Sequence, residues 1–143
     1  MLKAISLMFA EEGAQVILTG RNLIALNDLL KEMPINSKPH MVFKMDVTDE
    51  KNISNVFKEL SQLKVFINCI VNNAGIMEDA TLQMVKKDLI DKIFNTNVLG
   101  TMLPTQNSIK PFLRNRGGSV INLSSIIGTN GNLGQSIYGS SKA

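Results

Sequence analysis

Apolar residues recur along this chain with two alternating periods, one helical and one typical of strands. The helical spacing predicts helices over about 1–12, 22–32, 48–62 and 86–115, and a last helix from about Gln135 onward. Short apolar runs between them predict strands at 15–19, 41–45, 65–71 and 119–123. Strand alternating with helix indicates a parallel α/β sheet, and at 143 residues a doubly wound sheet rather than a barrel.

Individual residues refine the predicted elements. Thr48 can cap the helix that follows it, with Asp49 in the first turn, where acidic residues are favoured. Pro104 and Pro111 each remove a backbone donor, so we expect a kink or break in the long helix. The run 65–71 is almost wholly apolar, which is typical of a strand in a parallel sheet that is covered on both faces.

In such folds, ligands bind beyond the carboxyl ends of the strands. The small and polar residues that follow the predicted strands are Arg21, Asp46, Asn73-Ala74-Gly75 and Ser124-Ser125.

The composition excludes several classes of protein. Hydrophobic residues make up 44% and charged residues 19%, as in globular proteins. The net charge of +3 is mild and the basic residues form no stripe, which argues against nucleic-acid binding. No apolar run reaches the length of about 18 residues that spans a bilayer, so we expect no membrane partner. One histidine and one cysteine argue against a zinc site.

A single cysteine, Cys69, excludes an internal disulfide and favours a reducing compartment, so we predict a cytoplasmic location, with an organelle as the alternative. We interpret Cys69 as a simple core residue. The apolar N-terminus is short and runs into Glu11 and Glu12 without a cleavage site, which argues against a signal peptide.

The clearest chemistry lies at Tyr138 and Lys142, which share one face of the last predicted helix because they are four residues apart. A free phenol is a poor acid at neutral pH, and a nearby ammonium makes it a stronger one. Together with Ser125, at the end of a predicted strand, the pair suggests proton transfer to a carbonyl oxygen. The chain has no acid–histidine–serine set, which argues against a hydrolase triad.

Three further features each allow two interpretations. The small residues of the turn 72–75 let a flat ligand approach the backbone, or the turn is structural only. Asn97 lies inside a predicted helix, where it either bonds a backbone carbonyl or distorts the helix and holds a water. The glycines of 128–134 match no phosphate-binding fingerprint, so we interpret the segment as a flexible active-site loop, or else as a plain surface loop.

In this order and spacing, the motifs resemble the short-chain dehydrogenases/reductases, and within them the 3-oxoacyl-[acyl-carrier-protein] reductases. The resemblance covers essentially all of the chain. It is carried by Glu11–Arg21, Asp46-Val47, Asn72–Gly75, Asn95–Gly100, Gly118–Ser125 and the run from Gly128 through Gln135 to Tyr138-x-x-x-Lys142.

The resemblance implies catalytic roles for four residues. Tyr138 would protonate the substrate carbonyl as hydride arrives from the nicotinamide. Lys142 would strengthen that acid and bond the nicotinamide ribose. Ser125 would hold the carbonyl oxygen, and Asn97 would hold a water that relays protons to Lys142. By the same resemblance, the residues that contact the cofactor are Asp46 and Val47 beside the adenine, Asn73, Ala74 and Gly75 along the cleft, and Tyr138 and Lys142 themselves.

The choice of cofactor depends on the end of the strand at 15–19. An acidic residue there would select NAD, and an arginine suits the 2′-phosphate of NADP. The chain has Gly20-Arg21 and no acid, which favours NADPH over NAD. Arg21 as a plain surface arginine is the alternative.

Family members begin with a strand and a glycine-rich phosphate loop. This chain opens inside the helix that follows them, and it also lacks the last two strands of the family's sheet. We therefore expect residues 1–143 to form one incomplete Rossmann-like domain, a fragment that binds NADPH poorly by itself. Without the family's central strand, the strands at 15–19 and 41–45 lose their bridge to those at 65–71 and 119–123.

The resemblance implies an NADPH-dependent carbonyl reductase that acts on small or acyl-carrier-bound carbonyl substrates, with 3-oxoacyl thioesters as the leading substrate. A reductase for another alcohol/ketone pair, such as a sugar, steroid or xenobiotic, is the first alternative. A non-catalytic interaction remnant is the second. Family members usually form homodimers or tetramers through the helices that correspond to 86–115 and 135 onward, so we expect a homo-oligomer for a full-length form.

Overall fold

The computed structural model describes all residues, 1–143, and divides them into two compact units, Met1–Asp46 and Val47–Ala143. Each unit contains one parallel pair of strands, β1–β2 in the first and β3–β4 in the second. The predicted α/β class with parallel strands is confirmed. So is the expected lack of a bridging strand, because β1–β2 and β3–β4 form separate sheets. The assignment of the whole chain to one domain stays a prediction.

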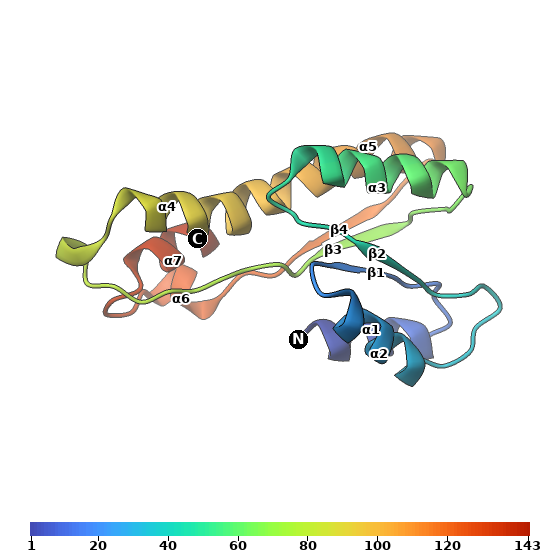
Figure 1. Ribbon diagram of the computed structural model, residues 1–143, viewed down its shortest axis with the longest axis horizontal. Coiled ribbons are helices and arrows are strands. Elements are labelled where there is room, and N and C mark those ends of the chain that lie inside the picture. Colours follow the sequence, from blue (N-terminus) through green and yellow to red (C-terminus); the bar gives the residue numbers. More distant parts are fainter. The chain divides into compact units, whose positions relative to one another are not determined.

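The first unit alternates helix and strand as the sequence predicts. Its elements are α1 (Leu2–Glu11), β1 (Ile17–Gly20), α2 (Leu23–Glu32) and β2 (Met41–Lys44). Both helices lie on the same side of the strand pair (Figure 1). Their apolar faces meet the sheet in a small core formed by Ala10, Leu18, Leu26, Leu29 and Met33.

His40 joins two parts of this unit just before β2 begins. Its Nδ1 accepts a hydrogen bond from the Val16 backbone N–H at 3.0 Å, and its Nε2 lies 2.9 Å from the Pro34 carbonyl oxygen. Because Nδ1 accepts, the ring is neutral with its proton on Nε2, which donates to Pro34. The imidazole therefore links the start of β1 to the end of the α2–β2 connection.

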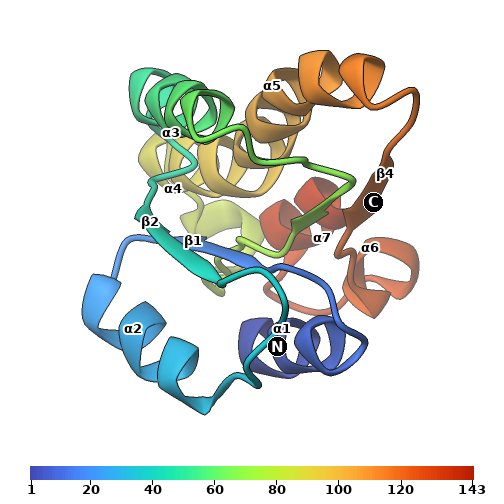
Figure 2. The ribbon, with the colours of Figure 1, turned by 90° about the vertical axis from the view of Figure 1, so that its right-hand side faces the viewer.

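The second unit places helices along and beyond its strand pair (Figure 1). Its elements are α3 (Glu50–Gln62), β3 (Cys69–Asn72), the 3₁₀ turn η1 (Leu82–Met84), α4 (Lys87–Phe94), the π turn η2 (Asn95–Leu99), α5 (Gly100–Arg114), β4 (Ser119–Asn122), α6 (Ile126–Asn130) and α7 (Ser136–Lys142). Helices α3 and α5 pack side by side (Figure 2).

The segment from α4 to α5 forms one continuous rod, in which η2 replaces a regular turn (Figure 1). Of the expected kink or break at the prolines, the break is wrong, because α5 runs through both Pro104 and Pro111, and the kink stays a prediction. The hydroxyls of Thr101 and Thr105 donate to carbonyl oxygens four residues earlier, each at 2.8 Å. These bonds satisfy the two hydroxyls within the helix. The irregular turn lies instead at Asn97.

Two local predictions in this unit are wrong. The cap of α3 is Asp49 rather than Thr48, and its carboxylate accepts the Asn52 backbone N–H at 3.0 Å. A carboxylate is favoured here because it also faces the positive end of the helix dipole. Strand β3 begins at Cys69 rather than at residue 65, because its partner β4 begins at Ser119, which pairs with Cys69.

The expected coverage of both sheet faces is also wrong for this chain. The side chains of β3 are half-buried up to Val71, and all four residues of β4 are exposed. One buried residue nevertheless ties the pair to α5. The Asn72 amide donates to Asn122 Oδ1 on β4 at 2.8 Å and to Thr105 Oγ1 on α5 at 2.9 Å. The bond to Thr105 fixes the position of α5 along the strands.

Candidate active site

Three separate segments of the second unit meet at Gly75. A Cβ added to Gly75 would lie 3.3 Å from Lys142 Nζ and 3.5 Å from Asn97 Oδ1. Gly75 follows β3, Asn97 lies in the π turn and Lys142 ends α7. These three predicted residues therefore lie close together, and their roles in a site stay predictions.

Asn97 is held on all sides of its amide. Its Oδ1 accepts the Ile76 N–H at 2.8 Å, and its Nδ2 donates to the Ile76 carbonyl at 2.9 Å and to Ser141 Oγ at 2.8 Å. Only 4% of Asn97 is exposed. Both interpretations drawn from the sequence apply in part, since the residue bonds a backbone carbonyl and the helix is distorted around it. The water that it would hold stays a prediction.

Lys142 and Tyr138 both lie in α7, a helix of seven residues. The Lys142 ammonium donates to the Leu123 carbonyl oxygen at 2.8 Å, just after β4 ends. Tyr138 is half-buried, one turn before it. Ser141 lies between them in the sequence and donates to the Tyr138 carbonyl at 2.7 Å. The lysine head is thus fixed between the ends of two neighbouring strands.

Ser125 caps α6 rather than standing at the end of a strand. Its Oγ accepts the Ile127 N–H at 3.3 Å. Ser124 donates to the Lys142 carbonyl oxygen. The serine pair therefore lies next to the end of α7, which agrees with a common site. The sequence does not predict α6, which begins at Ile126, just before the predicted loop 128–134, and runs into it as far as Asn130.

Glycines let α6 and α7 approach each other closely. A Cβ on Gly128 would lie 2.5 Å from the Lys142 carbonyl oxygen, and one on Gly139 would lie 3.2 Å from the Ile127 carbonyl oxygen. A side chain at Gly128 would force the two backbones apart, so its glycine has a packing reason.

The predicted cofactor residues of the second unit follow β3 or precede α3. Asn73 and Ala74 are half-buried, and Gly75 is exposed. Val47 packs against Gly100 at the start of α5, where an added Cβ would lie 2.7 Å from Val47 Cγ2. Val47 thus has a packing role, and its place beside the adenine stays a prediction.

The other two predicted cofactor residues belong to the first unit. Arg21 is exposed and directly follows β1, and Asn22 after it caps α2 through its side chain. No acidic residue stands at this strand end. Asp46 is half-buried and closes the unit two residues after β2.

Sequence reasoning missed two residues that hold the site, Gln135 and Ser141. Both are buried, at 8% and 9% exposure. Their partners, Asp79 and Asn97, lie 56 and 44 residues away along the chain. No local pattern signals pairs this distant.

Beyond these residues, one group has a shifted pKa. Burial raises the pKa of the Cys69 thiol on β3 above its ordinary value. The chain has no cluster of three or more His, Cys, Asp or Glu side chains arranged to hold a metal. None of its helices has the length and apolar character needed to cross a membrane.

Comparison with known proteins gives a consistent result. The sequence profile of the short chain dehydrogenase family matches residues 3–143. The 3-oxoacyl-[acyl-carrier-protein] reductase FabG of Thermotoga maritima is 38% identical over 99% of this chain and 57% of its own length. Carbonyl reductase family member 4 of Xenopus laevis is 34% identical over 98% of this chain and 58% of its own. The chain spans a little over half the length of these curated relatives.

The fold agrees as well. The crystal structure of serine dehydrogenase from Escherichia coli superimposes with a TM-score of 0.88, covering 98% of this chain and 64% of that one. Its sequence identity of 24% supports a shared fold and nothing further.

Proposed function

The chain belongs to the short-chain dehydrogenase family, and from this membership we propose that it carries the catalytic residues of an NADPH-dependent carbonyl reductase for 3-oxoacyl thioesters. The observation that carries the proposal is the convergence of Gly75, Asn97 and Lys142. A carbonyl reductase needs a positioned acid, a cation beside it and a backbone that a flat cofactor can approach. Lys142 Nζ lies beside the open backbone of Gly75, and Tyr138 lies one turn before Lys142 in α7, which supports the proposal.

Tyr138 is the proposed proton donor. As the carbonyl carbon accepts hydride, its oxygen gains negative charge, and the Tyr138 hydroxyl transfers its proton to that oxygen. Ser125 Oγ donates a hydrogen bond to the same oxygen and orients it. Positioned acid catalysis of this kind contributes about 10²–10⁴-fold to rate.

Lys142 has two proposed tasks. Its ammonium stabilises the negative charge that develops on Tyr138 as the proton leaves. It also donates hydrogen bonds to the nicotinamide ribose. The Leu123 carbonyl, 2.8 Å from Nζ, holds the ammonium at the strand ends where this contact would form.

Bound NADPH would supply the hydride. The residues present fit this group, since the bare backbone at Gly75 leaves room beside Lys142 that a Cβ would fill. Asn73 and Ala74 would line the same cleft, and Asp46 and Val47 would flank the adenine. The exposed Arg21, with no acid at its strand end, favours the 2′-phosphate of NADPH over the free hydroxyl of NAD.

The substrate class rests on similarity. A relative named 3-oxoacyl-[acyl-carrier-protein] reductase matches almost the whole chain, which supports a 3-oxoacyl thioester. Other relatives carry the name carbonyl reductase, which supports a second candidate, the reduction of other ketones by the same residues.

The test is NADPH-dependent reduction by the purified chain. Acetoacetyl thioester, a sugar ketone and a steroid ketone are offered separately, with NADPH or NADH, and nicotinamide absorbance is followed. Because the chain is expected to bind NADPH poorly by itself, we expect weak binding and slow turnover of the thioester with NADPH, and loss of that turnover in Tyr138→Phe. A chain that binds NADPH by fluorescence titration but reduces only the other ketones supports the second candidate. A chain that binds no nicotinamide cofactor contradicts both and supports the interaction remnant.

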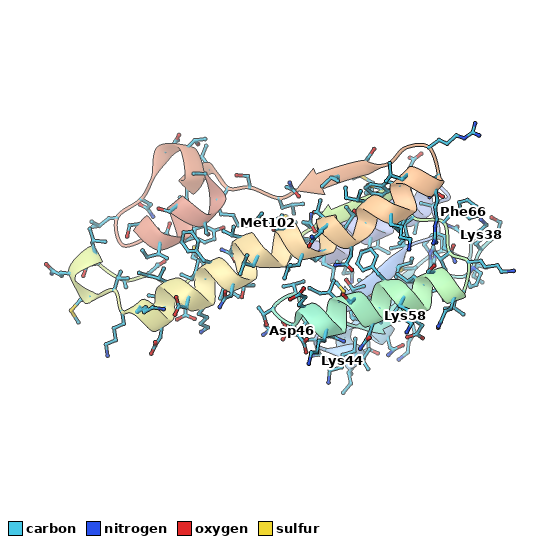
Figure 3. The ribbon with its side chains drawn as sticks, turned by 90° about the horizontal axis from the view of Figure 1, so that it is seen from above. Lys38, Lys44, Asp46, Lys58, Phe66 and Met102 are labelled. Atoms are coloured by element: carbon cyan, nitrogen blue, oxygen red, sulfur yellow. The ribbon has the colours of Figure 1, made fainter.

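We also propose that the chain assembles with copies of itself along α5. The outward side of this helix exposes Met102 at 60%, Ile109 at 48% and Leu113 at 75%, with Met102 labelled in Figure 3. Large apolar side chains in one exposed stripe are typical of a surface that a partner covers. The cytoplasmic location stays a prediction from the single cysteine.

A further inference from the structure

We propose that Gln135 is a positioning residue, which fixes the catalytic helix α7 to the segment that follows β3. The inference rests on the proposed function, because it takes α7 as the helix that carries Tyr138 and Lys142. It adds a residue that touches neither cofactor nor substrate in that proposal and acts through Asp79.

Helix α7 cannot hold its own position. It has seven residues, whereas isolated helices shorter than about 12–15 residues are marginal in water. Its side chains also give its first turn no cap hydrogen bond. The placement of Tyr138 must therefore come from contacts outside the helix.

Gln135 makes such contacts with every polar atom of its side chain. Nε2 donates to Asp79 Oδ1 at 3.0 Å and to Met77 Sδ at 3.1 Å, and Oε1 accepts from Asn132 Nδ2 at 3.1 Å. Only 8% of the residue is exposed. Its own carbonyl accepts the Gly139 N–H at 2.7 Å, which closes the first turn of α7. Gln135 therefore begins the helix and also bonds the segment 77–79 through its side chain.

A backbone hydrogen bond also joins these two segments. The Ala80 N–H donates to the Gly134 carbonyl at 2.8 Å, and Gly134 has a φ of +76°, which favours glycine. Figure 1 shows the segment after β3 running past α6 and α7. Residues 77–80 and 132–135 are therefore joined by side chain and backbone together.

The opposite end of α7 is fastened to the same segment. Ser141 accepts from Asn97 Nδ2, and Asn97 in turn holds both backbone groups of Ile76. Segment 76–80 consequently holds α7 at its N-terminus through Gln135 and at its C-terminus through Ser141. Tyr138 lies between the two attachments.

The chemistry requires a neutral amide at position 135. The N–H of glutamine can donate to the Asp79 carboxylate in a charge-assisted bond. A glutamate of the same size would present an oxygen to that carboxylate and be repelled by it. The polarity of the pair can also be reversed, because an asparagine at 79 could donate to a glutamate at 135.

The experiment uses the only tyrosine in the chain as its probe. The whole chain is labelled with ¹³C at the ring positions of tyrosine, so the NMR spectrum reports on Tyr138 alone. Spectra are compared for the unaltered chain, Gln135→Glu, Asp79→Ala and the double variant Gln135→Glu with Asp79→Asn. Circular dichroism of each variant monitors its helices.

We expect the Tyr138 ring signal to move toward its random-coil position in Gln135→Glu and to return in the double variant. Asp79 is exposed, so Asp79→Ala should keep the fold and shift the signal in the same direction. An unmoved signal in both Asp79→Ala and Gln135→Glu would overturn the proposal. A signal that the double variant fails to restore would overturn the pairing with Asp79.

Reductase assays on the same proteins separate this inference from the proposed function. If the chain reduces a carbonyl, Gln135→Glu should lower kcat by about 10²-fold, the cost of a misplacement of about 1 Å, with KM for NADPH little changed. The double variant should recover most of the loss. If no variant turns over any carbonyl, the proposed function fails, while the NMR comparison still decides the role of Gln135.

Discussion

Gly75 and Lys142 lie against each other, so that a single methyl group at Gly75 would stand 3.3 Å from the lysine Nζ. The ammonium ends a flexible side chain, and it can move aside at little cost to the fold. It would then leave the place in which it is proposed to meet the cofactor.

We therefore predict that Gly75→Ala changes the thermal midpoint little but weakens NADPH binding by about tenfold, the equivalent of about 1.4 kcal/mol. Fluorescence titration with NADPH measures this. The control is the same substitution in Lys142→Met, where the added methyl should have almost no further effect. An equal loss in both backgrounds would show that Gly75 acts independently of Lys142.

Removing the His40 ring should destabilise the first unit. His40→Phe leaves the Val16 N–H without its acceptor, and an unsatisfied buried donor costs about 1–3 kcal/mol. Val16 is half-buried, so the lower part of this range is expected in urea unfolding. Gln15→Ala is the matched control. It removes an exposed bond to the Pro39 carbonyl, and its effect should stay within about 0.5 kcal/mol.

Arg116→Gly should stabilise the chain. Arg116 follows α5 with a φ of 57°, a left-handed conformation that costs a non-glycine residue roughly 1–2 kcal/mol. Glycine also loses more chain entropy on folding, so the expected net gain is about 0.5–1 kcal/mol. Lys110→Gly, at an exposed position inside α5, should instead lose about 1 kcal/mol. Changes of the same sign would rule out the backbone explanation.

A charge in the apolar stripe of α5 should reduce self-association. Met102→Glu and Ile109→Glu each place a carboxylate where a copy of the chain is proposed to dock. Sedimentation equilibrium should then show a shift toward the monomer by tenfold or more in Kd, since an unpaired charge in an interface costs several kcal/mol. Lys58→Glu, on the exposed surface of α3 (Figure 3), should leave the association unchanged. A monomer at all concentrations would contradict the assembly.

Stability should fall as the solution becomes alkaline, partly because of Cys69. Burial raises the pKa of its thiol, so the unfolded chain releases this proton at lower pH than the folded chain. Above the unfolded pKa, of about 8.5, deprotonation therefore favours unfolding. Urea midpoints measured across this range should fall less steeply in Cys69→Ala. Alkylation of the thiol by iodoacetamide should also be slower in the folded chain than in urea.

The sequence predicts the order of helices and strands well, because each long element carries its own period. The errors in the predicted elements arise where residues distant in the sequence determine where an element begins or ends. Residues 65–68 are as apolar as a strand, but β3 starts at Cys69 because β4 offers no partner earlier. Pro104 should disturb a helix by its own chemistry, yet α5 continues through it and the irregular turn lies at Asn97.

The candidate site also contains residues that the local sequence identifies and residues that only distant contacts identify. Tyr138 and Lys142 are legible from the sequence because they stand four residues apart on one helix. Gln135 and Ser141 are not, because their meaning depends on Asp79 and Asn97, which only folding brings near. Ser125 shows an intermediate case, since the residue was identified but its capping of α6 was not.

The π turn at Asn95–Leu99 places one extra residue in the rod from α4 to α5. Because a π turn takes more residues per turn than an α-helix, it accommodates this residue without turning the helices on either side out of phase. Deleting one residue here could therefore restore regular hydrogen bonding while the side of α5 that buries Pro104, Ser108 and Phe112 keeps its direction. What would change is the irregular backbone from which Asn97 bonds Ile76 and Ser141, so the extra residue matters to the candidate site more than to the core.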